Sequence, residues 1–114
     1  TDLRPDRLAI YSFAFVPWIR PNQRKIDEAD LPHREAKMAL YFAALEKLLA
    51  AGYEPIGMGH FALPGDELAR AASAGRLDRN FMGYTVKPSN AMIAFGVSGI
   101  GEVEGGFFAN EKKL

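Results

Sequence analysis

A chain of 114 residues is long enough for one small folded segment, and its composition already excludes several classes of function. Lys+Arg and Asp+Glu balance at 14 each, so we expect no electrostatic attraction to nucleic acid or to an anionic membrane surface. The chain has no cysteine, which excludes a disulfide scaffold, a thiolate zinc site and an iron–sulfur cluster held by these residues.

The sequence carries no signal for a membrane or for export. Its apolar stretches are far shorter than the ~20 residues that cross a bilayer. Its first residues lack the apolar segment of a secretory signal, and they begin without methionine, which predicts a processed or excised chain. We therefore expect a cytoplasmic protein that contacts no membrane.

The first half of the chain predicts a strand, a loop and a helix, in that order. Residues 7–16 are apolar on both alternating faces, as in a strand covered on two sides, and Pro17 ends this pattern. Residues 18–32 are mostly polar and predict a long loop. Residues 33–51 predict the clearest helix, because apolar side chains recur at three- and four-residue steps and a glycine follows.

The second half predicts shorter elements. Residues 53–62 predict a second strand, in which Gly57 and Gly59 allow another part of the chain to approach the backbone closely. Asp66 is a favourable N-cap for a short helix that ends at Gly75. Residues 79–86 predict a hairpin arm, and residues 87–90 predict a turn. A third buried strand is predicted at 91–97, followed by a glycine-rich loop at 98–101 and a solvated tail at 110–114.

This order of elements predicts the fold class. Alternation of strand and helix is typical of an α/β protein with a parallel sheet and right-handed crossovers. We expect about three core strands with two helices and a short hairpin, all within one segment that spans residues 1–114. So few strands leave sheet edges open to solvent, which favours a slice of a larger fold or self-association through those edges.

His60 is the residue with the clearest chemical potential. A histidine in a glycine-flanked strand can form functional hydrogen bonds or transfer protons. The alternative is a core histidine that donates to a backbone carbonyl, and from the residues alone this alternative is favoured. His33 is expected on the surface, and neither histidine has a partner spaced for metal binding.

Three further groups carry weaker signals. A cationic group, Gln23, Arg24 and Lys25, can bind carboxylates or phosphates. An acidic group, Asp27, Glu28 and Asp30, can bind a cation. The glycine-rich stretch 96–101 lacks the G-x-G-x-x-G spacing of a dinucleotide loop. For both charged groups, a solvated loop is the favoured interpretation.

Short stretches along nearly the whole chain match one family in order and in spacing. They lie at residues 5–8, 13–17, 23–26, 30–32, 52–53, 56–58, 60–62, 64, 66–69, 79–81, 83–85, 96–98 and 100. In these stretches the sequence resembles the oxygen-independent coproporphyrinogen III oxidases, which are radical S-adenosylmethionine enzymes. The combination is specific, because the stretches keep the family's order over most of the chain.

The resemblance implies a fold and a reaction. The chain would form later strands of a partial (β/α) barrel. Members of the family oxidatively decarboxylate two propionates of coproporphyrinogen III to vinyl groups without oxygen, which gives protoporphyrinogen IX in haem biosynthesis. They use S-adenosylmethionine and a [4Fe–4S] cluster held by a Cys-x-x-x-Cys-x-x-Cys loop, which is absent here and expected upstream of Thr1. This segment would be inactive alone and would supply only pocket wall and orientation.

The resemblance also implies residues of a site. Ala14 and Ile100 fall on positions that contact S-adenosylmethionine in the family. The candidates for a pocket that binds coproporphyrinogen III or a related tetrapyrrole are Arg24, His60, Met82 and Tyr84. No catalytic residue and no metal ligand is assigned within this chain.

Four positions depart from the family pattern. Phe15, Gly59, Met82 and Asp78 stand where the family usually has His, Asp, Gln and His, respectively. Three of these changes replace a polar group near the expected pocket, and a pocket with fewer polar groups selects a different ligand. The alternative function is therefore a divergent tetrapyrrole- or haem-binding relative without this activity. A third hypothesis is an interaction module that pairs with a second copy through its sheet edges.

Overall fold

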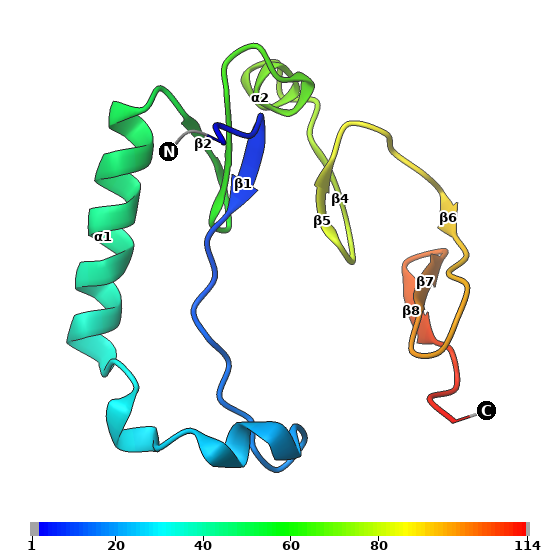
Figure 1. Cartoon of the computed structure of the whole chain (residues 1–114). Coiled ribbons are helices and arrows are strands. Elements are labelled where there is room, and N and C mark those ends of the chain that lie inside the picture. Colours follow the sequence, from blue (N-terminus) through cyan, green and yellow to red (C-terminus); the bar gives the residue numbers. More distant parts are fainter. Residues whose placement is uncertain (1–2, 114) are drawn as a thin grey trace. The chain divides into compact units, whose positions relative to one another are not determined.

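The computed structural model describes residues 3–113, and the chain divides into two compact units, Thr1–Asp66 and Glu67–Leu114. The described part holds α-helices and short strands, so the chain is of mixed α/β class (Figure 1). Its strands form small sheets in which each paired strand is antiparallel to its neighbour. The expected parallel sheet with right-handed crossovers is therefore wrong for the described strands.

The first unit is built on a three-stranded sheet with the order β1-β3-β2. The strands β1, β2 and β3 span Arg7–Ala9, Glu54–Gly57 and His60–Ala62. The single strand predicted at 53–62 is thus a hairpin, because Met58 and Gly59 form a turn with φ of +49° and +77°. Positive φ at both central residues gives the turn a twist that matches the twist of the flanking strands.

Gly59 brings this hairpin close to the residue that follows β1. Its carbonyl accepts a hydrogen bond of 2.8 Å from the backbone N–H of Ile10. A Cβ atom at position 59 would lie 2.5 Å from the carbonyl oxygen of Ile10. The prediction that a glycine here permits close approach of another segment is confirmed at Gly59.

Only the beginning of the strand predicted at 7–16 is a strand. Beyond Ile10 the chain runs without regular secondary structure to a turn at 17–19 (Figure 1). The apolar pattern predicted cover on both faces, but Tyr11 and Phe13 are exposed. The ladder with β3 ends at the pair Ala9 and His60, so the segment 11–16 has left the only sheet of this unit's described residues.

The helix α1 spans Arg34–Ala50, which agrees with the prediction to within one residue at each end. It ends in a Schellman motif, as the glycine after it predicted: Gly52 N–H donates to Leu49 C=O and Tyr53 N–H donates to Leu48 C=O, both at 3.0 Å. None of its residues is buried, although Leu45 and Leu48 are half-buried.

Two short 3-10 turns lie in the segment predicted as a long polar loop. They are η1, Pro21–Lys25, and η2, Glu28–Asp30. The carboxylate of Asp27 caps η2, because it accepts a hydrogen bond of 3.0 Å from Ala29 N–H. One member of the acidic group therefore has a local structural partner.

The second unit begins with the helix α2, Glu67–Ser73. This helix also ends in a Schellman motif, in which Gly75 N–H donates to Ala72 C=O at 3.1 Å and Arg76 N–H donates to Ala71 C=O at 2.8 Å. The predicted stop at Gly75 is confirmed.

The hairpin arm predicted at 79–86 is a complete hairpin. It consists of β4, Asp78–Asn80, and β5, Gly83–Thr85, joined by a two-residue turn. In this turn Met82 N–H donates to the side-chain oxygen of Asn80 at 2.9 Å. Such a side-chain-to-backbone bond is common where asparagine enters a tight turn.

The third sheet has the order β6-β7-β8. These strands span Ala91–Met92, Ile100–Val103 and Gly106–Ala109. The buried strand predicted at 91–97 is therefore wrong beyond Met92, and Phe95 in the following loop is 94% exposed. The side chain of Asn110 donates to the carbonyls of Ala94 and Gly96, at 2.8 and 2.9 Å. The first residue of the tail predicted as solvated is therefore bound to the loop that follows β6. Leu114 lies outside the described residues.

The buried apolar residues are few, and each unit has its own. Tyr53, Phe61 and Ala62 are buried in the first unit. The buried residues of the second unit are Leu68, Ala69 and Ala71. Within residues 3–113, no helix is both long enough and apolar enough to cross a membrane.

Candidate functional site

The segment around Ala14 is held by one side chain, Gln23, from η1. The Gln23 amide oxygen accepts a hydrogen bond of 2.6 Å from Val16 N–H, and its amide nitrogen donates to Ala14 C=O at 3.1 Å. Gln23 is half-buried, whereas Ala14 itself is exposed. The solvated interpretation of this part of the loop is therefore wrong for Gln23, whose amide is bound to the backbone on both sides of Phe15.

Arg24 lies next to Gln23 and closes the same loop. Its Nε donates to the carbonyl of Pro17 at 3.4 Å, which is a long hydrogen bond. The carbonyl of Val16 accepts from Ile19 N–H and Arg20 N–H, both at 2.9 Å. The loop between Ala14 and Arg24 is thus closed by several hydrogen bonds, and the guanidinium of Arg24 remains exposed on its surface.

His60 has identifiable partners at both ring nitrogens. Its Nδ1 lies 3.3 Å from Gly57 C=O, and its Nε2 lies 3.1 Å from the hydroxyl of Tyr11. The two rings meet edge to face, with centroids 5.9 Å apart and an interplanar angle of 83°. A carbonyl can only accept, so Nδ1 carries the proton; in neutral His60 the Nε2 then accepts from the Tyr11 hydroxyl. His60 Nδ1 thus contacts a backbone carbonyl, as the alternative interpretation expected, but the residue is half-buried and does not lie in the core. Tyr11 is a second partner that the sequence did not reveal.

Asp66, predicted as the N-cap of α2, is also bound to β1. The Nε of Arg7 lies 2.8 Å from each carboxylate oxygen of Asp66. The side chain of Arg7 is 43% exposed and that of Asp66 only 9%, so the carboxylate is the better shielded partner. This ion pair ties the start of β1 to the segment that follows β3, and solvent at Arg7 screens it.

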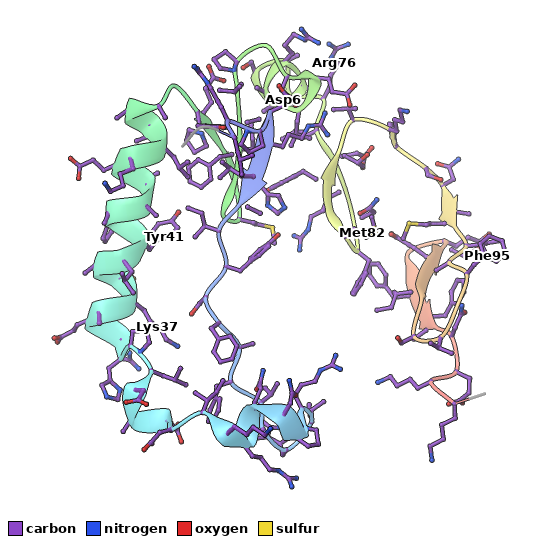
Figure 2. The ribbon with its side chains drawn as sticks, in the orientation of Figure 1. Asp6, Lys37, Tyr41, Arg76, Met82 and Phe95 are labelled. Atoms are coloured by element: carbon purple, nitrogen blue, oxygen red, sulfur yellow. The ribbon has the colours of Figure 1, made fainter. Side chains whose placement is uncertain are left out.

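Met82 and Tyr84 lie in one hairpin. Met82 occupies the turn between β4 and β5 and is exposed (Figure 2). Tyr84 lies in β5 opposite Arg79 and is half-buried. The structure therefore brings these two candidates together on one short element, where an apolar thioether and a phenol are two residues apart.

Ile100 begins β7 and is half-buried. The next residue, Gly101, is buried, and a Cβ at that position would collide with the ring of Phe108. Phe108 and Gly101 are directly paired across β7 and β8. A Cβ at position 101 would also lie 2.6 Å from the carbonyl oxygen of Met92 in β6, so glycine at this position permits a close approach of the neighbouring backbone.

One shallow apolar hollow lies in the first unit between α1 and the segment after β1. It encloses about 320 Å³, and its lining residues are Ile10, Tyr11, Ser12, Phe13, Pro32, Lys37, Leu40 and Tyr41. Lys37 and Tyr41, labelled in Figure 2, line it from α1. A second, more open hollow of about 580 Å³ adjoins it and includes Phe15 and His33. His33 is exposed, as predicted.

The predicted site residues are divided between the two units. Ala14, Arg24 and His60 belong to the first unit, and the other three, Met82, Tyr84 and Ile100, belong to the second. No group of three or more His, Asp or Glu side chains that could hold a metal ion occurs within residues 3–113.

Mixed α/β architecture with small antiparallel sheets defines the class of this chain, and a solved structure specifies it further. The coproporphyrinogen III oxidase of Escherichia coli, described as a radical SAM enzyme, matches with a TM-score of 0.91 and 41% identity over 98% of this chain and 26% of that chain. No protein-family model matches the chain.

Curated relatives agree with the solved structure. The oxygen-independent coproporphyrinogen III oxidase of a Synechocystis species is 44% identical over 112 residues, which is 98% of this chain and 24% of the relative. The protein of the same name from Salmonella typhimurium is 43% identical over 114 residues, which is 100% of this chain and 25% of the relative. The chain thus spans about a quarter of the length of the relatives it matches.

The resemblance found in the sequence is confirmed: over nearly all of its own length this chain is similar to oxygen-independent coproporphyrinogen III oxidases. The names of these relatives support the oxidase over the haem-binding alternative.

Proposed function

We propose that this chain is one part of an oxygen-independent coproporphyrinogen III oxidase, and that it forms pocket wall rather than the catalytic centre. The whole protein would oxidatively decarboxylate two propionates of coproporphyrinogen III to vinyl groups, giving protoporphyrinogen IX. The observation that supports this most is the likeness to the Escherichia coli enzyme, with a TM-score of 0.91 and 41% identity over 98% of this chain.

The cofactors of such an enzyme fit this chain unequally. A [4Fe–4S] cluster is held by cysteine thiolates, and this chain has no cysteine, so the cluster does not fit here and its ligands belong outside these residues. The two residues assigned to S-adenosylmethionine each have a side chain whose chemistry suits it. Ala14 exposes a small apolar side chain on a fixed loop, and Ile100 presents a half-buried aliphatic one, which suits contact with an adenine or ribose face. When bound, S-adenosylmethionine supplies the radical chemistry, and this chain orients it.

The pocket candidates supply chemically distinct contacts to a tetrapyrrole. The exposed guanidinium of Arg24 suits a propionate carboxylate, because arginine pairs with carboxylates in a planar, two-bond geometry. Tyr84 offers a phenol, and exposed Met82 offers a soft apolar surface for a pyrrole face. His60 offers an imidazole ring whose two nitrogens already have partners in Gly57 and Tyr11. Each of these assignments is part of the proposal.

We extend the proposal to the architecture and the compartment. Both units would belong to one partial (β/α) barrel domain whose remaining strands lie in the rest of the protein. The sheets described here are antiparallel, so parallel barrel pairing would involve strands outside this chain. The partners would be the rest of that barrel and the tetrapyrrole, not nucleic acid or a membrane, and the compartment would be the cytoplasm.

A graft tests this function without any assumption about the residues that flank the chain. The matching segment of the Escherichia coli coproporphyrinogen III oxidase is replaced by this chain, and the chimera is purified without oxygen. We expect the cluster absorbance of the host, binding of S-adenosylmethionine, and conversion of coproporphyrinogen III to protoporphyrinogen IX. The matched control is the same graft with the two adenosyl contacts enlarged, Ala14→Leu and Ile100→Phe, which we expect to retain the cluster and lose S-adenosylmethionine affinity.

The departures from the family pattern supply the second control. A chimera that keeps its cluster and binds S-adenosylmethionine but leaves coproporphyrinogen III unchanged would contradict the proposed substrate. In that case the back-substitutions Phe15→His and Met82→Gln determine whether the lost polar groups are responsible. A stoichiometric haem complex of the inactive graft, seen as a Soret shift, would favour the haem-binding alternative instead.

A further inference from the structure

The side chain of Gln23 forms hydrogen bonds to the backbone of the segment 14–16 in the way that a neighbouring β-strand would. Its oxygen accepts from Val16 N–H at 2.6 Å and its nitrogen donates to Ala14 C=O at 3.1 Å, so one amide bridges the backbone on both sides of Phe15. In a parallel sheet, one residue of a neighbouring strand bonds to the carbonyl before and the amide after the residue opposite it. Gln23 reproduces this pairing with a side chain, in a segment that has no strand partner among the described residues of its unit.

The position of Gln23 is itself fixed by local structure. It lies in the middle of η1, where its backbone N–H donates to Arg20 C=O at 2.9 Å and its carbonyl accepts from Ile26 N–H at 3.0 Å. The carbonyl of Val16 accepts two further backbone bonds from the turn that precedes η1. The amide of Gln23 therefore reaches the segment 14–16 from a backbone that is itself held by hydrogen bonds.

We infer that Gln23 is a positioning residue, which holds the segment Ala14–Val16 so that the side chain of Ala14 is presented to S-adenosylmethionine. The inference rests on the proposed function in one respect, the contact of Ala14 with that cofactor. The hydrogen-bonded clamp itself does not depend on it. Gln23 would contact neither cofactor nor substrate. It would act only through its hydrogen bonds to the backbone of residues 14 and 16.

Substitutions at position 23 separate the two hydrogen bonds of the clamp. Gln23→Met keeps the length of the side chain and removes both bonds. Gln23→Glu keeps an acceptor for Val16 N–H but replaces the donor to Ala14 C=O by a second acceptor. Asn22→Ala is the matched control, because Asn22 is an exposed polar residue of the same 3-10 turn.

The first measurement is amide hydrogen exchange, resolved to single residues, on the 114-residue chain. The amide of Val16 reports the clamp directly, since Gln23 accepts its hydrogen bond. A net hydrogen bond contributes about 1 kcal/mol, so Gln23→Met should lower the protection of Val16 by roughly fivefold to tenfold. Gln23→Glu and Asn22→Ala should leave it unchanged, and the amides of Ile19 and Arg20 should keep their protection in all variants.

The second measurement is the affinity for S-adenosylmethionine. It is made on the longer protein of which, under the proposed function, this chain is one part. We expect Gln23→Met to weaken binding about as much as it lowers Val16 protection, roughly fivefold to tenfold, with Gln23→Glu intermediate and Asn22→Ala equal to wild type. The thermal midpoint of the whole protein should not follow this order, which distinguishes positioning from a general loss of stability.

Each outcome decides a different part of the inference. Unchanged Val16 protection in Gln23→Met would overturn the clamp. Lowered Val16 protection in Gln23→Met with unchanged S-adenosylmethionine affinity would overturn the positioning role. The proposed function would still stand in that case, because the wild-type longer protein would bind S-adenosylmethionine. If the wild-type longer protein bound no S-adenosylmethionine, the proposed function and the positioning role would both fail, and only the clamp would survive in the exchange data.

Discussion

Gly59 is the position at which one added methyl group should disturb the first unit most. Its φ of +77° is unfavourable for any residue with a Cβ, and alanine there costs about 1–2 kcal/mol for the backbone conformation alone. The added Cβ would also lie 2.5 Å from the carbonyl oxygen of Ile10, which is backbone and cannot turn aside as a flexible side chain can. We therefore expect Gly59→Ala to separate Ile10 from the hairpin.

The size of the effect follows from these two terms. Loss of the Ile10 N–H to Gly59 C=O bond adds about 1 kcal/mol to the conformational cost, for a total of roughly 2–3 kcal/mol. Exchange of the Ile10 amide should accelerate by about 30-fold or more, since each 1.4 kcal/mol is a factor of ten. The assay is residue-resolved hydrogen exchange on the chain, together with urea unfolding followed by circular dichroism.

Two glycines of the same unit provide matched controls. Gly52 has a φ of +85°, and the nearest atom to its added Cβ is Arg4 Nη2 at an ordinary 3.7 Å, so Gly52→Ala should cost only the conformational term of about 1–2 kcal/mol. Gly65→Ala meets nothing within 4 Å and should be nearly neutral. If Gly59→Ala left Ile10 as protected as Gly52→Ala does, the close backbone approach would not be the constraint we describe.

The remaining predictions concern two tyrosine hydroxyls. Tyr11→Phe removes the donor to His60 Nε2, so the ¹⁵N shift of that nitrogen should change while the shifts of His33 stay constant; equal changes at both histidines would contradict the contact. Tyr53→Phe removes the hydroxyl that donates to the carbonyl of Pro5 at 2.6 Å, next to the buried ring of Tyr53. We expect the free energy of unfolding in urea to fall by about 1–3 kcal/mol. A fall of less than about 0.5 kcal/mol would contradict a stabilising role of this hydrogen bond.

Local signals were sufficient to predict where the helices end. Gly52 and Gly75 were each predicted as a stop, and each is the left-handed residue of a Schellman motif, with φ of +85° and +62°. Such a motif is completed by residues within one helical turn, so its signal is contained in a short stretch of sequence. The turn between β4 and β5 was not predicted, because residues 79–86 were interpreted as a single hairpin arm.

Strand pairing could not be predicted, because the partners are distant in sequence. β1 pairs with β3 across more than fifty residues, and nothing near β1 specifies that partner or its antiparallel direction. The same limit hid Tyr11 as the partner of His60, since that contact depends on the register of this pairing. Gln23 was within reach of sequence reasoning, but it was grouped with its charged neighbours, and the group was interpreted as part of a solvated loop.

The uncovered apolar surfaces connect the failed prediction at 10–16 with the proposed function. Residues 7–16 are apolar on both faces, as in a strand covered on two sides, yet in the first unit only Arg7–Ala9 pairs and Phe13 is 52% exposed. The helix α1 likewise has apolar residues at helical spacing and none buried. Because this chain spans about a quarter of the relatives it matches, exposed apolar residues of this kind are expected if residues outside the chain cover them in the whole protein. Gln23 bonds to the backbone of this segment at a place where the described residues of the first unit have no strand beside it.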